Sequence, residues 1–161
     1  MVILSTTLGA SLYENDRKKL RILSLVLMLI EEIYADIRYT GSTVEEILIS
    51  CAKNPMYKQL KFLQLAKNEI QEGRLSNSSL KNAIKTDFQG LNLNEDALLP
   101  LYTLADKLGT TDTTGQLQML EGCKLQILQL RSLQSDRCNA LGKMYISLGL
   151  LLGIGTAVIL A

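Results

Sequence analysis

The sequence contains no histidine and no tryptophan, and its 161 residues include only 2 prolines and 11 glycines. Without an imidazole, the chain lacks the usual general base, the Ser-His and Cys-His nucleophile pairs, and histidine ligands for a metal. The low content of proline and glycine argues against a low-complexity disordered chain. Basic and acidic side chains number 17 and 16, so the basic surplus of a dedicated nucleic-acid-binding protein is also missing.

The residues that usually carry chemistry form no recognisable site. Neither GxxxxGK[ST] nor GxGxxG occurs, so no phosphate-binding loop is predicted. Cys51, Cys123 and Cys138 are odd in number and form no CxxC pair, which argues against a disulfide framework and a zinc site. Adjacent acids such as Glu31-Glu32 point in different directions on a helix, so we interpret them as solvated faces. We therefore predict a protein that is not an enzyme and has no cofactor.

Both ends of the chain lack charge, because every charged residue lies between Glu14 and Lys143. As a helix, residues 144–161 would extend about 27 Å at about 1.5 Å per residue, close to the roughly 30 Å hydrocarbon core of a bilayer. We predict a C-terminal transmembrane helix over 144–161; a buried core helix is the alternative.

The uncharged opening, residues 1–13, would extend only about 20 Å as a helix. It lacks the basic first region of a signal peptide, so we predict a partial N-terminal membrane segment. Lys18 and its basic neighbours follow this segment, and Arg137 and Lys143 precede the tail. Because Lys and Arg flank membrane segments on the cytoplasmic side, residues 14–143 are predicted to form a cytoplasmic domain at the cell membrane.

The apolar residues between the two ends follow a helical period. Two adjoining stripes cover residues 20–37, which is typical of a central helix with several neighbours. Thr43 and Glu46 have the spacing of a capping box, and Asn54-Pro55 is typical of the start of another helix, with an apolar face from Met56 onward. Pro100 predicts a late start near Leu99 or a kink in the fifth helix.

Glycines at positions 73, 90 and 109 are expected to end helices, and Asp112 is expected to cap a last helix over 112–161. No strand-like alternation competes with this pattern. The predicted fold is all-α, an antiparallel bundle of about six helices whose last helix continues into the C-terminal transmembrane helix. We expect this last helix to pair antiparallel with the first.

Small residues recur every four positions in the tail, at Gly149, Gly153 and Ala157. This spacing lets two membrane helices approach closely. We predict that these residues pack against another membrane helix, in a hairpin, in a homo-oligomer or in a larger complex.

Two motifs in the domain resemble those of the stage III sporulation protein AB family of endospore-forming bacteria. The first is Asp36-Ile37-Arg38-Tyr39 with Ser42-Thr43-Val44, in which the family commonly has Glu for Asp36 and Pro for Thr43. The second runs from Leu108 to Gln116 and fits Leu-Gly-x-x-Asp-x-x-x-Gln at every fixed position. The motifs give the interaction candidates Asp36, Tyr39, Gly109, Asp112 and Gln116. A purely structural role in helix ends and helix contacts is the alternative for each.

The resemblance implies a subunit of the channel complex between mother cell and forespore. The family is similar to the cytoplasmic domain of the type II secretion inner-membrane platform protein, an all-helical bundle. The implied partners are the mother-cell membrane, the cytoplasmic ATPase of the channel and other channel subunits. The family also begins with a fuller membrane segment than residues 1–13 provide.

Two alternatives remain at this point. One is a platform component of a secretion or pilus system, although such proteins usually carry two copies of the helical domain and no internal repeat occurs here. The other is a membrane enzyme with an unrecognised site, which convergent ionisable groups in a deep pocket would favour.

Overall fold

The computed structural model describes the backbone of residues 2–91, 93 and 95–160, and the side chains of residues 14–91, 93, 97–142 and 144. Within these residues the chain forms six α-helices and two short 3-10 helices, and no strand. The predicted all-helical fold is therefore confirmed. In order along the chain, the elements are α1 (Val2–Tyr39), α2 (Val44–Lys53), η1 (Pro55–Tyr57), α3 (Lys61–Gln71), α4 (Asn77–Phe88), η2 (Gln89–Leu91), α5 (Glu95–Lys107) and α6 (Thr113–Leu160).

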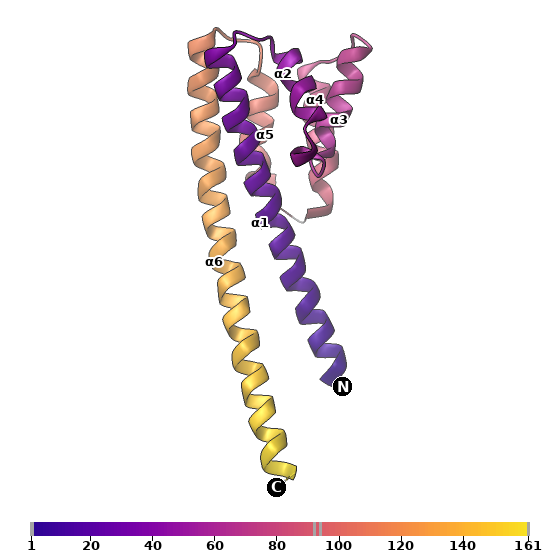
Figure 1. The fold of residues 1–161 in the computed structure, drawn as a ribbon, viewed down its shortest axis with the longest axis vertical. Coiled ribbons are helices and arrows are strands. Elements are labelled where there is room, and N and C mark those ends of the chain that lie inside the picture. The colour runs from indigo at the N-terminus through magenta and orange to yellow at the C-terminus, as the bar shows by residue number, and fades with distance from the viewer. Residues whose placement is uncertain (1, 92, 94, 161) are drawn as a thin grey trace.

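The two long helices, α1 and α6, lie side by side and run in opposite directions, as expected (Figure 1). Both extend beyond the short helices on the same side, so the two termini lie at one end of the molecule. Polar contacts join the pair: the Arg131 Nε donates to Ser24 Oγ at 2.9 Å, and Lys124 Nζ lies 2.8 Å from Glu31 Oε1. Helices α2 to α5 pack beside the upper half of this pair.

The central position predicted for the first helix is also confirmed. Its apolar stripes are buried: Val26, Ile30 and Ile33 are at most 2% exposed, and they join one core with side chains from all the other helices. Leu120 and Ile127 of α6 are fully buried against this core. Removing this apolar surface from water is the main favourable term for the bundle.

Most helix ends follow from local sequence. Thr43 and Glu46 form the predicted capping box at the start of α2, and Ser76 accepts from Ser79 at the start of α4. Gly73 and Gly109 follow α3 and α5 with φ of 65° and 78°, a conformation that favours glycine.

One helix start differs from the prediction. Asn54-Pro55 begins only the short η1, because the backbone departs from helical angles at Leu60, and Met56 is 48% exposed instead of lying on a buried face. Of the two alternatives for the fifth helix, the late start is wrong: α5 begins at Glu95 and contains Pro100, whose carbonyl oxygen lies 3.3 Å from the Cys123 Sγ donor.

Within the described part of the chain, no helix has the length and apolarity that crossing a bilayer requires. The side chains of residues 1–13 and 145–161 lie outside the described residues, and with them the predicted membrane segments and the small residues Gly149, Gly153 and Ala157. The backbone continues through these segments as α1 and α6.

Candidate functional site

The two sequence motifs meet at the distal end of the bundle, which we define as the end opposite the two termini (Figure 1). The first motif lies at the end of α1 and in the loop to α2, and the second joins α5 to α6. Residues of both motifs line one hollow of about 270 Å³: Ile37, Gly41, Ser42, Thr43, Val44, Glu45, Gly109, Thr113 and Gln116. Stretches about 70 residues apart in sequence thus form one surface.

Gly109 allows the α5–α6 loop to lie against the start of α2. Its φ of 78° is unfavourable for other residues, and a Cβ placed there would lie 3.5 Å from Val44 Cγ2. The second motif therefore contacts the first directly at this glycine. Because 3.5 Å is an ordinary van der Waals contact, the positive φ and not a lack of space is what favours glycine at this position.

Asp112 caps the N-terminus of α6. Its Oδ1 accepts from the Gly115 N–H at 3.3 Å, and its carbonyl oxygen accepts from the Gln116 N–H at 2.9 Å. A carboxylate here also suits the positive end of the helix dipole. Asp112 is exposed and does not line the hollow, so its observed role is to fix where α6 begins.

Gly115 is a residue that the sequence interpretation passed over. A Cβ at this position would lie 2.8 Å from Asp112 Oδ1 and 3.3 Å from Thr111 Cβ, closer than ordinary packing allows. The cap by Asp112 therefore needs glycine three residues later. A glycine in the first turn of a helix, where alanine would be better for helix propensity, was the available signal.

Gln116 combines a satisfied and an unsatisfied polar group beside the hollow. Its Nε2 donates to the Thr111 carbonyl oxygen at 2.9 Å, which orients the amide. Its Oε1 is buried and has no hydrogen-bond partner among the described residues. A buried acceptor without a partner costs free energy, and because this oxygen is covered, a donor from a bound molecule would reach it only if the neighbouring side chains moved.

Asp36 and Tyr39 lie beside the hollow and do not line it. The Asp36 carbonyl oxygen accepts from the N–H and the hydroxyl of Thr40, at 3.0 and 2.7 Å, which closes α1. Tyr39 is 75% exposed, and the Arg38 guanidinium lies 5.4 Å from its ring centroid. Tyr and Arg side chains are enriched among the residues that contribute most to binding at protein interfaces.

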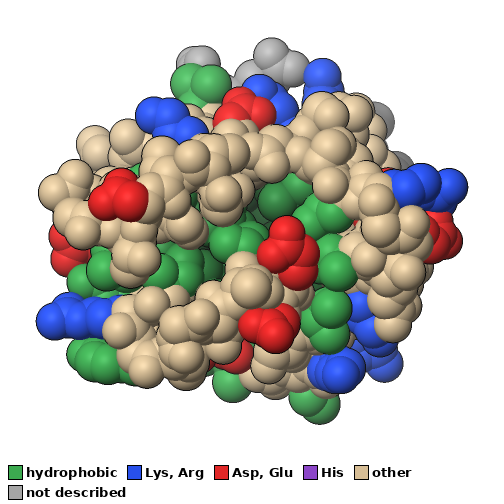
Figure 2. All heavy atoms as spheres, turned by 90° about the horizontal axis from the view of Figure 1, so that it is seen from above, with side chains coloured by type: hydrophobic (Ala, Val, Ile, Leu, Met, Phe, Trp, Pro, Cys, Tyr) green, Lys and Arg blue, Asp and Glu red, His purple; other side chains and the backbone are tan. Residues whose placement is uncertain are grey.

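Figure 2 looks onto the distal end. Acidic side chains lie around hollows whose floors are apolar, and most of the basic side chains visible in this view lie toward the edges. Glu45 lines the distal hollow. Glu46, in the first turn of α2, and Asp112, just before α6, are exposed. This end therefore suits a partner that brings basic or hydrogen-bond-donating groups.

A second polar cluster, buried between α1, α2 and η1, involves Glu32, Tyr57 and Cys51. The Tyr57 hydroxyl donates to Glu32 Oε2 at 2.5 Å, and burial together with this carboxylate raises the pKa of Tyr57. Burial, assisted by the charges of Glu32 and Asp36, raises the pKa of the Cys51 thiol to about 12. A thiol with this pKa is protonated at neutral pH and is a poor nucleophile, so the cluster joins helices and has no evident chemistry.

No group of three or more metal-ligating side chains occurs among the residues whose side chains are described. The family model for stage III sporulation protein AB matches residues 1–161, the full length of the chain. No curated protein and no solved structure matches the chain.

Proposed function

Because the chain belongs to the stage III sporulation protein AB family, we propose that it is a non-catalytic scaffold subunit of the channel complex between mother cell and forespore. The family description assigns the chain to sporulation. The proposed mechanism is assembly: membrane helices hold the protein at the mother-cell membrane, the bundle lies on its cytoplasmic side, and the distal end docks the cytoplasmic ATPase of the channel.

The membrane part of this proposal is supported by the ends of α1 and α6. Both ends extend past the bundle in the same direction, and residues 1–13 and 144–161 carry no charge. The basic residues that follow and precede these segments favour the cytoplasmic side for the bundle. Gly149, Gly153 and Ala157 would pack against membrane helices of other subunits or of a second copy.

The docking part is carried by one observation, the meeting of both motifs in the distal hollow. This surface is the part of the bundle farthest from the two termini, so a partner in the cytoplasm would reach it without contacting the bilayer. Gln116 lines this hollow and has a buried acceptor, Oε1, that a partner would satisfy if binding uncovered it, and Tyr39 offers an exposed ring. Such groups carry much of the binding energy at protein interfaces.

A non-catalytic role is supported by the side chains themselves. The chain has no imidazole, and burial raises the pKa of the Cys123 thiol to about 12, as it does for Cys51. The Glu32–Tyr57 pair lies between packed helices and does not line the distal hollow.

The test is a pull-down from membranes of the sporulating host, with the full chain as bait in mild detergent. We expect the channel ATPase to be recovered with the unaltered chain. Gln116→Ala and Tyr39→Ala are each expected to weaken recovery about five-fold or more, since truncating a central contact typically costs 1 kcal/mol or above. Gln118→Ala, which changes an exposed amide two residues along α6, is the matched control.

Equal recovery with Gln116→Ala, Tyr39→Ala and the control would contradict docking at the distal end. Recovery of a secretion or pilus ATPase instead would favour the alternative, a platform component of such a system. Recovery of channel subunits without any ATPase would restrict the scaffold to contacts through its membrane helices.

A further inference from the structure

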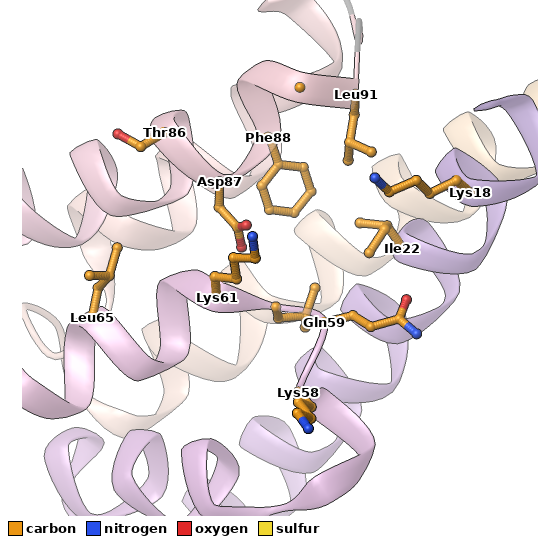
Figure 3. A pocket seen from close by; sticks show the side chains of 12 residues that line it. Lys18, Ile22, Lys58, Gln59, Lys61, Leu65, Thr86, Asp87, Phe88 and Leu91 are labelled. Carbon is orange, nitrogen blue, oxygen red and sulfur yellow. The ribbon is translucent and has the colours of Figure 1, made fainter.

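A second hollow lies at the proximal end of the bundle, which we define as the end nearer the two termini. It has a volume of about 700 Å³ and opens between α1, the η1–α3 link, the end of α4 and η2. Figure 3 shows Lys18 reaching from α1 toward Phe88, with Leu91 and Ile22 on either side of its amine. Neither sequence motif contributes to this hollow.

The rim of the hollow has an excess of positive charge. Lys18, Lys58 and Lys61 line it, against the single carboxylate of Asp87. Among the described side chains, Lys18 and Lys58 form no ion pair, and Lys61 extends toward Asp87 (Figure 3).

The Asp87 carboxylate is already engaged with the protein. Its Oδ2 accepts from the Phe62 N–H at 3.0 Å and so caps α3, whose own N-cap, Leu60, makes no side-chain hydrogen bond. Burial of this carboxyl raises its pKa against the effect of that hydrogen bond. Two of the three lysine amines are therefore left for an external anion.

The floor of the hollow is apolar. Phe88 and Leu91 are 2% and 5% exposed and belong to the core, and Leu65 at one edge is 45% exposed. A ligand that fits has an anionic group for the lysines and an apolar part to cover this wall. A phospholipid supplies both, through its phosphate and the first methylenes of its chains.

The hollow lies close to the proposed membrane segments, where a phospholipid headgroup would be found. Lys18 lies five residues beyond residue 13, about 7.5 Å along the helix. The Gln134 Nε2 donates to the Asp16 carbonyl oxygen at 3.5 Å, so the stretch of α6 that leads into the tail runs beside the end of the uncharged opening. The hollow thus opens close to the level at which both helices would enter the headgroup region.

We propose that the proximal hollow binds the phosphate of an anionic phospholipid through Lys18 and Lys58, so that the bundle rests on the bilayer in a fixed orientation. This proposal rests on the membrane anchoring proposed above. Bound lipid would hold the distal end away from the membrane and toward its partner.

The experiment uses the full chain in lipid nanodiscs, made either of phosphatidylcholine alone or of phosphatidylcholine with phosphatidylglycerol. Lysine acetylation rates, read by peptide mass spectrometry, report access to each amine. We expect Lys18 and Lys58 to be protected several-fold more in the discs that contain phosphatidylglycerol. Lys85 and Lys107, which are exposed and lie outside the hollow, are expected to react at similar rates in both.

Variants give the second measurement. Native mass spectrometry of the full chain from mixed micelles counts retained phosphatidylglycerol against phosphatidylcholine. We expect Lys18→Gln and Lys58→Gln each to lower the ratio of retained phosphatidylglycerol to phosphatidylcholine about five-fold. This change corresponds to about 1 kcal/mol per lysine near an anionic surface. The double variant Lys85→Gln/Lys107→Gln has the same net charge as Lys18→Gln/Lys58→Gln and should keep the preference.

Equal acetylation of Lys18 and Lys58 in both kinds of disc would overturn the proposal, as would equal loss of preference in the two double variants. Protection by inorganic phosphate in discs of phosphatidylcholine alone would identify a free anion as the ligand and would overturn it too. Failure of the chain to enter discs of either composition would contradict the membrane anchoring instead, so the two failures are distinguishable.

Discussion

At position 115, two physical effects of glycine oppose each other. Replacing a glycine in a helix by alanine normally stabilises the helix by about 1 kcal/mol. In the first turn of α6, however, a Cβ would lie 2.8 Å from Asp112 Oδ1, and moving that carboxylate removes a cap worth about 1 kcal/mol. The sequence alone cannot reveal this conflict, since it depends on where the Asp112 side chain lies.

Gly115→Ala is therefore expected to leave the free energy of unfolding unchanged or to lower it. Gly122→Ala is the matched control, because the same helix continues there and nothing lies within 4 Å of the added Cβ. We expect Gly122→Ala to stabilise the full chain by about 1 kcal/mol, measured by urea unfolding in detergent. Equal stabilisation by both changes would show that the Asp112 cap contributes nothing.

The buried thiols predict how stability depends on pH. The pKa values of Cys51 and Cys123 are about 12, against 9.0 for an ordinary thiol. Above pH 9 the unfolded chain loses these protons while the folded chain keeps them. The two protonated thiols therefore make their full contribution to the free energy of unfolding below about pH 9. This contribution declines as the pH rises toward 12.

We expect the urea midpoint of the full chain to fall between neutral pH and about pH 11. The double variant Cys51→Ala/Cys123→Ala should show a shallower fall, because the two thiols no longer contribute to it. Tyr57, whose pKa is raised by burial and by Glu32, contributes to the fall in both proteins. Parallel curves for the two proteins would contradict this assignment of the thiols.

The helices differ in how far local sequence determines their ends. The start of α2 and the ends of α3 and α5 were predictable, since the Thr43–Glu46 capping box and the glycines at 73 and 109 act within a few residues. The start of α3 was not predictable. It depends on the hydrogen bond from the Phe62 N–H to Asp87, a residue 25 positions away, and no local pattern contains that information.

In the candidate site, too, some features follow from local sequence and others depend on how the helices pack. Gly109 and Asp112 were identified from the sequence, and the structure explains both through the geometry of the α5–α6 loop. The sequence did not indicate that this loop would meet the start of α2, because the contact of Gly109 with Val44 depends on how the helices pack. Of the proximal lysines, the sequence indicated only Lys18, as charge that flanks a predicted membrane segment. That Lys58 and Lys61 line the same hollow depends on the path of η1 and α3.

For the molecule as a whole, the two ends of the bundle have different chemistry. The distal hollow contains Glu45 and the unpartnered Gln116 oxygen, whereas the proximal hollow has three lysines around an apolar floor. The full-length match to the stage III sporulation protein AB family confirms the resemblance inferred from the motifs. The scaffold proposed above would use this difference, with the proximal end facing an anionic membrane surface and the distal end facing a partner that brings basic or hydrogen-bond-donating groups.

The proposed membrane helices supply the last prediction. Gly149 and Gly153 lie one helical turn apart, and replacing both by isoleucine would place branched side chains where another helix is proposed to approach. We expect Gly149→Ile/Gly153→Ile to weaken crosslinking of the full chain to itself or to channel subunits in host membranes. Leu148→Ile/Leu152→Ile, with the same spacing on a neighbouring face, is the control. Because the buried residues among the described side chains lie in 22–138, the circular dichroism melting of the bundle should not change in either variant. Unchanged crosslinking in the glycine variant would mean that the tail only anchors the protein, and that assembly depends on the bundle alone.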